Sequence, residues 1–269
     1  MLRFTLHALI VLILTLLTQI GGIAYLLALA VSRIWRIRFP TKLALFLLCY
    51  AGATFAASLA APMFGRVPLS CLSGAADHLV VRSPIYCALN RNYVTPEVRD
   101  LAMALAAHMD QEFPGTVTVA LDANFPFMNG FPLLPHLSHA DGRKLDFAYY
   151  YKDAEGHFLN GVTRSPIGYF AFEEPAPGDE LPCAGRNDWL TTRWDFDALQ
   201  PLFPAYGLEE QRMSAMIAWL TTEGVTRFHL EKIFIEPHLK NALGITDTHV
   251  RFQGCRAARH DDHIHIQVE

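Results

Sequence analysis

The sequence predicts an α+β domain, with a small and mostly antiparallel sheet flanked by helices, preceded by two membrane-spanning helices. Two long apolar runs without charge near the N-terminus predict the spans. Beyond them, segments patterned as strands follow one another without regular helical crossovers, which favours α+β over a parallel α/β sheet. Two segments that contain histidine and aspartate, 139–146 and 260–265, predict a metal site on that sheet.

The apolar runs cover about residues 8–31 and 43–64, and neither contains a charged residue. Each reaches the roughly 20 apolar residues that are needed to cross a bilayer. A buried core helix is the alternative for either run alone, but two consecutive runs of this length favour a membrane. We therefore predict an anchor over residues 1–65 with two transmembrane helices, and an exported domain over residues 66–269.

The link between the runs is positively charged, with the basic residues Arg33, Arg36, Arg38 and Lys42. Basic residues in a short loop favour the cytoplasmic side, so both ends of the anchor are expected on the opposite side of the membrane. A cleaved signal peptide is the competing interpretation, because residues 28–30 fit the small-x-small rule. Cleavage there would leave the basic cluster on the wrong side, which favours an uncleaved anchor.

The exported part is acidic. Residues 1–62 contain five basic residues and no acidic one, so the remaining 17 basic and all 26 acidic residues lie in 63–269. Nucleic acid binding needs a basic surface, and a nucleic-acid partner is therefore not expected. The sequence identifies no protein partner.

Five cysteines fit this organisation. Cys49 lies in the second apolar run and is expected to be a free thiol. The other four lie in the exported part, where an oxidising compartment would allow two disulfides with three possible connectivities. We favour Cys71–Cys87 with Cys183–Cys255 over the other pairings, and four reduced buried thiols are the alternative. No Cys-x-x-Cys occurs, so neither a cysteine-zinc site nor a thiol-redox site is indicated.

Capping residues and residue alternation predict the first elements of the exported domain. Thr95 is a helix cap, and Pro96 suits the first helical position. Apolar residues then recur at helical spacing up to Phe113. The alternating Val and Thr of 116–121 predict a strand.

Loops and turns dominate the middle of the chain. Residues 124–135 are rich in Pro, Gly and Phe and are expected to be a loop, whereas 144–151 reads as a strand. Residues 165–188 carry many turn-forming residues and are expected to be a long surface excursion. The remaining elements are a helix at 208–223, a strand at 228–235, a short helix at 237–243, and strands at 249–253 and 263–268.

The last strand would present two imidazoles to one face. Successive side chains in a strand alternate between faces, so His263 and His265 point the same way and the neighbouring isoleucines point the other way. A lone His-x-His is more often a surface or hydrogen-bonded pair than a ligand pair. His136, His157 and His238 are expected in exposed loops.

The second histidine segment supports a metal site. Gly142 would permit a tight turn that brings His139 beside Asp146. Without its partner segment, Asp146 would read as a solvated carboxylate at the end of a strand. Imidazole nitrogen and carboxylate oxygen together are the ligands of a catalytic zinc ion, which keeps one position open for water.

The two segments resemble the motifs of the penicillin-insensitive murein endopeptidases. The first motif is Gly130-Phe131-Pro132, then Pro135-His136-x-Ser138-His139-x-x-Gly142-x-x-x-Asp146, and the second is His260-Asp261-Asp262-His263-Ile264-His265. Residues 232–243 also resemble the strand and helix before that second motif. The family belongs to a wider group with lysostaphin-type peptidases, D-Ala-D-Ala peptidases and the hedgehog signalling domain. The resemblance covers about 124–151 and 228–269.

The resemblance implies one zinc ion held by His139, Asp146 and His265, with His263 and His260 as unliganded active-site histidines. It also implies hydrolysis of peptide crosslinks in peptidoglycan. The expected location is then the bacterial cytoplasmic membrane, with the catalytic domain in the periplasm and the membrane contacted through the two spans. Peptidoglycan peptide would be the substrate.

The chemistry of the residues agrees with that activity. A zinc ion with three protein ligands lowers the pKa of its water to about 7 and polarises a carbonyl. His263 is the candidate general base, although stabilising the oxyanion is an open alternative, and His260 is the candidate for transition-state stabilisation. Asp262 and Asp261 would orient imidazoles as hydrogen-bond acceptors. For Asp261, a solvated loop acid is an equal alternative.

The chain departs from the family pattern in three ways. It begins with two spans, and residues 152–224 match nothing in the family. The wider group often has a glutamate before its C-terminal histidine pair, whereas here the nearest candidates, Glu231 and Glu236, have no feature that makes either catalytic. Trp189, Trp194 and the tyrosines 149–151 are expected to be core rather than substrate contacts. A zinc-binding but inactive cell-wall binding or signalling module is the alternative function. A membrane-assembly protein is disfavoured by the few polar groups in the spans.

Overall fold

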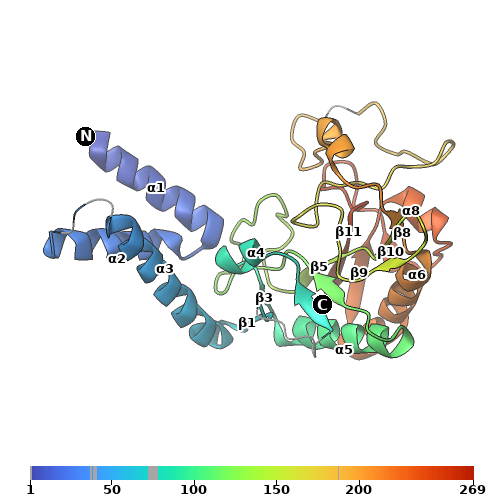
Figure 1. Ribbon diagram of the computed structural model, residues 1–269, viewed down its shortest axis with the longest axis horizontal. Helices are drawn as coiled ribbons and strands as arrows, with labels where there is room; N and C mark the ends of the chain where they lie inside the picture. Colours follow the sequence, from blue (N-terminus) through green and yellow to red (C-terminus); the bar gives the residue numbers. More distant parts are fainter. Residues whose placement is uncertain (1, 37, 39–40, 72–77, 187) are drawn as a thin grey trace.

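The computed structural model describes residues 2–36, 38, 41–71, 78–186 and 188–269 (Figure 1). The chain begins with the helices α1 (Leu2–Thr18), α2 (Gly21–Ile34) and α3 (Thr41–Ala60), the last continued by the 3-10 turn η1 (Ala61–Phe64). These helices project from one side of an α+β domain (Figure 1). Part of the basic link between α2 and α3 lies outside the described residues.

The first apolar run does not form the single span that the sequence predicts. Gln19 adopts a left-handed backbone with φ 64°, and the run folds there into the antiparallel pair α1 and α2. Gly21 permits the close approach, since a Cβ at that position would lie 2.6 Å from the Thr18 hydroxyl oxygen. Within the described residues, Thr41–Phe64 is the one helix long and apolar enough to cross a membrane.

The domain that follows these helices is built on a six-stranded sheet in the order β10-β9-β11-β5-β4-β2. Its strands, in chain order, are β2 (Leu79–Val81), β4 (Thr118–Ala120), β5 (Lys144–Ala148), β9 (Leu230–Phe234), β10 (Val250–Arg251) and β11 (His263–Val268). The central pairs β9-β11, β11-β5 and β5-β4 are antiparallel, as predicted.

Both edge pairs of this sheet are parallel, so the sheet is mixed. A parallel pair requires a crossover connection, and two helices supply it. Helix α5 (Pro96–Glu112) connects β2 to β4, and the short α8 (Pro237–Ala242) connects β9 to β10. Thr95 caps α5 as predicted, because its hydroxyl accepts a hydrogen bond from the Val98 amide.

Smaller elements surround the sheet. A two-stranded sheet joins β1 (Val67–Pro68) to β3 (Tyr93–Val94), and a three-stranded sheet has the order β7-β6-β8. The strands of this second sheet are β7 (Phe158–Leu159), β6 (Tyr151–Lys152) and β8 (Gly207–Leu208). The remaining elements are helical: α4 (Pro84–Ala88), η2 (Asp197–Leu202), α6 (Glu210–Trp219), the π-helical turn η3 (Leu220–Gly224) and α7 (Val225–Phe228).

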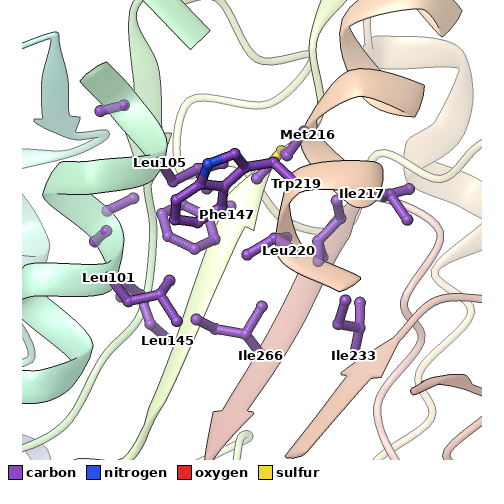
Figure 2. Close-up of a cluster of buried hydrophobic side chains, with 14 of the residues drawn as sticks. Leu101, Leu105, Leu145, Phe147, Met216, Ile217, Trp219, Leu220, Ile233 and Ile266 are labelled. Atoms are coloured by element: carbon purple, nitrogen blue, oxygen red, sulfur yellow. The ribbon is translucent and has the colours of Figure 1, made fainter. Parts of the chain in front are cut away.

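One face of the sheet is covered by α5, α6 and η3 (Figure 2). Leu145 and Phe147 from β5 and Ile266 from β11 pack there against Leu101 of α5 and Leu220 of η3, all fully buried. Because strand side chains alternate, Asp146 and the two histidines of β11 point to the opposite face. The apolar core therefore determines which residues the other face presents.

Two disulfides, Cys71–Cys87 and Cys183–Cys255, join the cysteines as favoured from the sequence, and Cys49 is free. The second bridge ties residues 165–203 to the chain just before His260. We call this segment the excursion; apart from η2, its described residues form neither helix nor strand. As expected, residues 165–188 form neither helix nor strand where the structure describes them. This segment lies over the sheet face that carries the histidines.

Candidate metal centre

The three residues expected as zinc ligands lie together. His265 stands directly opposite Asp146 in the β11-β5 register, and its Nδ1 is 2.9 Å from the Asp146 Oδ1. His139 arrives from the preceding loop, with its Nε2 3.2 Å from the same oxygen and 3.0 Å from His265 Nδ1. Tetrahedral ligands about 2.1 Å from a zinc ion lie about 3.4 Å from one another, so this spacing suits one ion.

The turn that delivers His139 depends on Gly142, as the sequence predicts. Its φ is 75°, in the left-handed region, and a Cβ would lie 2.3 Å from the Nε of Arg66. The His139 Nδ1 donates to the Ala123 carbonyl at 2.7 Å. In the neutral ring this hydrogen bond leaves the lone pair on Nε2, which faces Asp146 and His265.

A fourth residue, His136, belongs to the same cluster. Its ring, that of His139 and the Asp146 carboxylate form a buried group whose possible ligand atoms all lie within 4.8 Å of one another. The expectation of an exposed loop is wrong for His136, which is 7% exposed, and for His238, which is 5% exposed and donates to the Glu173 carbonyl. His157 is exposed as expected.

His263 and His260 complete the cluster of imidazoles. The Nδ1 of His263 donates to Asp262, and its Nε2 lies 3.6 Å from the Asp146 Oδ2. The Nε2 atoms of His263 and His265 are buried and have no hydrogen-bond partner among the described residues. The ring centroid of His260 lies 4.9 Å from that of His263 and 5.6 Å from that of His265.

The two aspartates of the second motif have different surroundings. Asp262 accepts from His263 and from the Phe170 amide, which fixes the His263 ring. Asp261 is fully buried and pairs with Arg259, which also binds Asp195 at 2.9 Å. Burial raises the pKa of Asp261 to about 7 even though Arg259 opposes the shift.

Tyr169 is a site residue that the sequence did not reveal. Its hydroxyl donates to the Asp146 Oδ2 at 2.6 Å and accepts from the Asp122 amide at 3.0 Å. Burial, together with the charge of Asp146, raises the pKa of this phenol well above its ordinary value. Tyr169 lies in the irregular excursion, where no pattern marks it, and only its buried phenol next to a carboxylate identifies it.

A second carboxylate stands behind the first. Asp122 accepts from His136 Nδ1 at 3.0 Å and from Arg91 through both of its oxygens. Burial opposes ionisation of Asp122, but the charge of Arg91 outweighs it and lowers the pKa to about 2. Asp122 is therefore ionised and orients the His136 ring.

The cluster favours a positive charge at its centre. Burial opposes the ionisation of Asp146, yet the charges on His139 and His263 hold its pKa well below the ordinary value. Burial lowers the pKa of His265 to about 4 and that of His260 well below its ordinary value, so both rings are neutral at pH 7. Burial opposes protonation of His139 and His263, but the Asp146 carboxylate outweighs it and raises the pKa of both rings. A bound cation would take the place of those protons, and imidazole nitrogens with a buried carboxylate are a donor set that fits zinc.

The cluster is reached through a cavity of about 160 Å³ beside His136, His260 and His265. Its lining also includes Pro135 and Leu137 from the loop before β5, and Thr192 and Ala258 from later in the chain. A cavity of about 400 Å³ is lined by the excursion, by both cysteines of the Cys183–Cys255 bridge and by Arg259, and its lining contains none of the clustered histidines.

The aromatic residues considered for substrate contact divide into two groups. Tyr149, Tyr150 and Tyr151 are buried core residues, as expected. Trp189 and Trp194 are 91% and 42% exposed, so the core expectation is wrong for both. Trp194 lines the narrow space above His136 and His263.

No protein-family model matches this chain, and no curated protein matches it either. The resemblance to murein endopeptidases therefore rests on the two motifs and on residues 232–243. The geometry is consistent with those motifs, because the residues that the resemblance marks as ligands converge in space.

Proposed function

We propose that this chain is a membrane-anchored zinc metallopeptidase that hydrolyses peptide crosslinks of peptidoglycan in the periplasm. The observation that carries the proposal is the buried contact among His139, Asp146 and His265, next to the further imidazole of His263, whose Nε2 has no hydrogen-bond partner among the described residues. A purely structural metal site would need no such extra imidazole. The two disulfides support an oxidising compartment.

The residues divide the chemistry between them. When bound, zinc polarises the scissile carbonyl and makes water nucleophilic at neutral pH. His263, whose ring is held by Asp262, accepts the proton of the attacking water on Nε2 and returns it to the leaving amine. His260, a neutral ring beside the cluster, donates a hydrogen bond to the developing oxyanion. Tyr169 holds the second oxygen of Asp146.

The test uses the full chain, purified in detergent. We expect one zinc ion per chain and conversion of crosslinked muropeptide dimers to monomers. His263→Ala should keep the zinc and lower kcat about 10²- to 10⁴-fold, because it removes the base and leaves the expected ligands in place. Stoichiometric zinc without any product would support the inactive binding module instead, and a chain without zinc would remove both functions.

A further inference from the structure

A large cavity lies between the three N-terminal helices. Its volume is about 900 Å³, near the upper end of the roughly 300–1,000 Å³ that is typical of ligand pockets. Helix α2 packs against both α1 and α3 and contributes the buried lining residues Ala28 and Ser32, whereas Leu14 and Phe46 line the cavity from α1 and α3. Figure 1 shows α1 and α2 diverging from their shared turn. We call this cavity the helix groove.

Contacts among all three helices shape the helix groove. The Tyr25 hydroxyl of α2 lies 2.6 Å from the Nδ1 of His7 in α1, within hydrogen-bond distance. The Tyr25 ring also meets the Phe46 ring of α3 edge to face, with centroids 6.1 Å apart. All three of these residues line the groove. Its shape is therefore held by side chains of its own lining.

The domain contacts these helices elsewhere and leaves the helix groove open. The Tyr50 hydroxyl of α3 donates to the Ala88 carbonyl at 2.5 Å, and the Gln19 side chain accepts from the Phe127 amide at 2.9 Å. No residue beyond Phe46 belongs to the lining of the groove. The groove therefore lies in the part of the anchor that the domain does not cover.

One end of the helix groove is positively charged. Arg33 in the last turn of α2 and Lys42 in the first turn of α3 both line it, and both side chains are exposed. The lining contains no acidic residue, and residues 1–62 contain none either. The anchor itself therefore has no carboxylate that could neutralise these two cations. The groove joins a long apolar space to a positive end.

We propose that the helix groove binds one phospholipid with an anionic headgroup. Its acyl chains would lie between α1 and α3, and its headgroup would meet Arg33 and Lys42. Basic pockets between membrane helices are suited to anionic headgroups, because lipid phosphate is the counter-charge that the surrounding membrane supplies. A zwitterionic lipid carries a positive charge of its own to the same place, so the two cations should select against it.

A helix from a second copy of this chain is a poorer occupant. All three N-terminal helices lack acidic residues, so a second copy would bring no negative charge to Arg33 and Lys42. Like charges at such a contact are destabilising. The proposal needs the helices to lie at a membrane and is independent of zinc and of the proposed hydrolysis.

Native mass spectrometry of the full chain in detergent tests the charged end. The probes are phosphatidylglycerol, which is anionic, and phosphatidylcholine, which is zwitterionic, with the same acyl chains. The double variant Arg33→Gln/Lys42→Gln removes the positive end of the groove. Arg36→Gln/Arg38→Gln is its matched control, because it removes the same charge from the same link but from outside the lining.

Two leucines of α3 test the apolar part of the helix groove. Leu43 lines the groove and Leu48 does not, although their side chains are 58% and 72% exposed. Leu43→Trp would fill part of the space for the acyl chains, and Leu48→Trp adds the same bulk outside it. All of the substituted side chains are exposed, so each variant is expected to fold.

We expect saturable binding of one phosphatidylglycerol per chain, about 10-fold or more tighter than phosphatidylcholine. Arg33→Gln/Lys42→Gln should lose this preference, and the control pair should keep it. Leu43→Trp should weaken binding of both lipids several-fold, and Leu48→Trp should weaken neither.

Equal affinity for the two lipids, or equal losses in the two double variants, would overturn the proposal. Displacement of the lipid by millimolar inorganic phosphate would assign the cations to a free anion and would overturn it as well. A dimer without bound lipid would overturn it in favour of a helix from a second copy. Each outcome is read without zinc and without substrate.

Discussion

The carboxylate of Asp146 has two oxygens with separate partners. Oδ1 faces His139 and His265, whereas Oδ2 accepts from Tyr169. The phenol therefore fixes the orientation of a residue that we propose as a metal ligand. Hydrogen bonds of this kind to a ligand commonly contribute about 10- to 100-fold to metal affinity.

Tyr169→Phe should accordingly weaken zinc binding about 10- to 100-fold, measured by competition with a chelator. Tyr86→Phe is the matched control, because its hydroxyl is also buried nearby but donates to the Ile167 carbonyl and not to Asp146. Equal affinities of the two variants would contradict the role of Tyr169.

Asp122 should make the zinc-free chain sensitive to acid. Its pKa in the folded chain, about 2, lies below the ordinary 3.8, so the ionised form stabilises the fold. That contribution is fully present above pH 4 and is lost as the pH falls towards 2. The shift corresponds to about 2 kcal/mol. Unfolding followed by circular dichroism should show a loss of stability between pH 4 and 2 that is smaller by this amount in Asp122→Asn.

At the residue scale, the sequence predicted the histidines of the second motif better than their surroundings. The period of two along β11 was enough to place His263 and His265 on one face. The burial of His136 and Tyr169 was not predicted, because residues in a loop have no periodic pattern that indicates burial. Their positions depend on contacts with Asp122 and Asp146, which are remote in the chain.

Two glycines allow the turn before β5 to be tested. Gly142 and Gly130 both have φ 75°, but only Gly142 meets another side chain, that of Arg66. Alanine at Gly130 should therefore cost about 1 kcal/mol through backbone strain. Gly142→Ala should cost at least 1 kcal/mol more and should weaken zinc binding, since the turn positions His139. Similar unfolding free energies for the two variants would show that the contact with Arg66 is unimportant.

The Cys183–Cys255 bridge holds the excursion over the site. It closes a loop with a sequence separation of 72, against 16 for Cys71–Cys87. In the chain-entropy model these loops correspond to about 4 and about 3 kcal/mol. Replacing both cysteines of the longer loop by serine should thus lower the melting temperature more than the same change in the shorter loop. It should also reduce activity, because Thr192 and Ala258 border the cavity.

At the element scale, strong local sequence signals were enough to predict a helix or a strand, and weak signals were not. The cap at Thr95 and the alternation in 263–268 predicted α5 and β11. The break at Gln19 was missed because Leu, Ile and Ala on both sides continue the same apolar pattern. The parallel edges of the sheet were missed because pairing between β9 and β10 depends on the crossover through α8, which sequence periodicity does not report.

At the scale of the whole molecule, the histidine cluster combines distant parts of the chain. The two motifs supply the histidines, whereas residues 165–203 supply Tyr169 and part of the cavity rim. The excursion resembles no motif, so its position could come only from the folded chain. The parts of the site that are held by the regular sheet were predictable, and the parts that cover it were not.

A single glycine, Gly65, separates the end of η1 from the buried Arg66. A linker this short limits how far the domain can lie from the helices. A domain of about 200 residues is roughly 40 Å across. In the membrane-anchored enzyme that we propose, the site would therefore act within about that height above the membrane. Peptidoglycan nearest the membrane would be within reach, and the outer part of the wall would not.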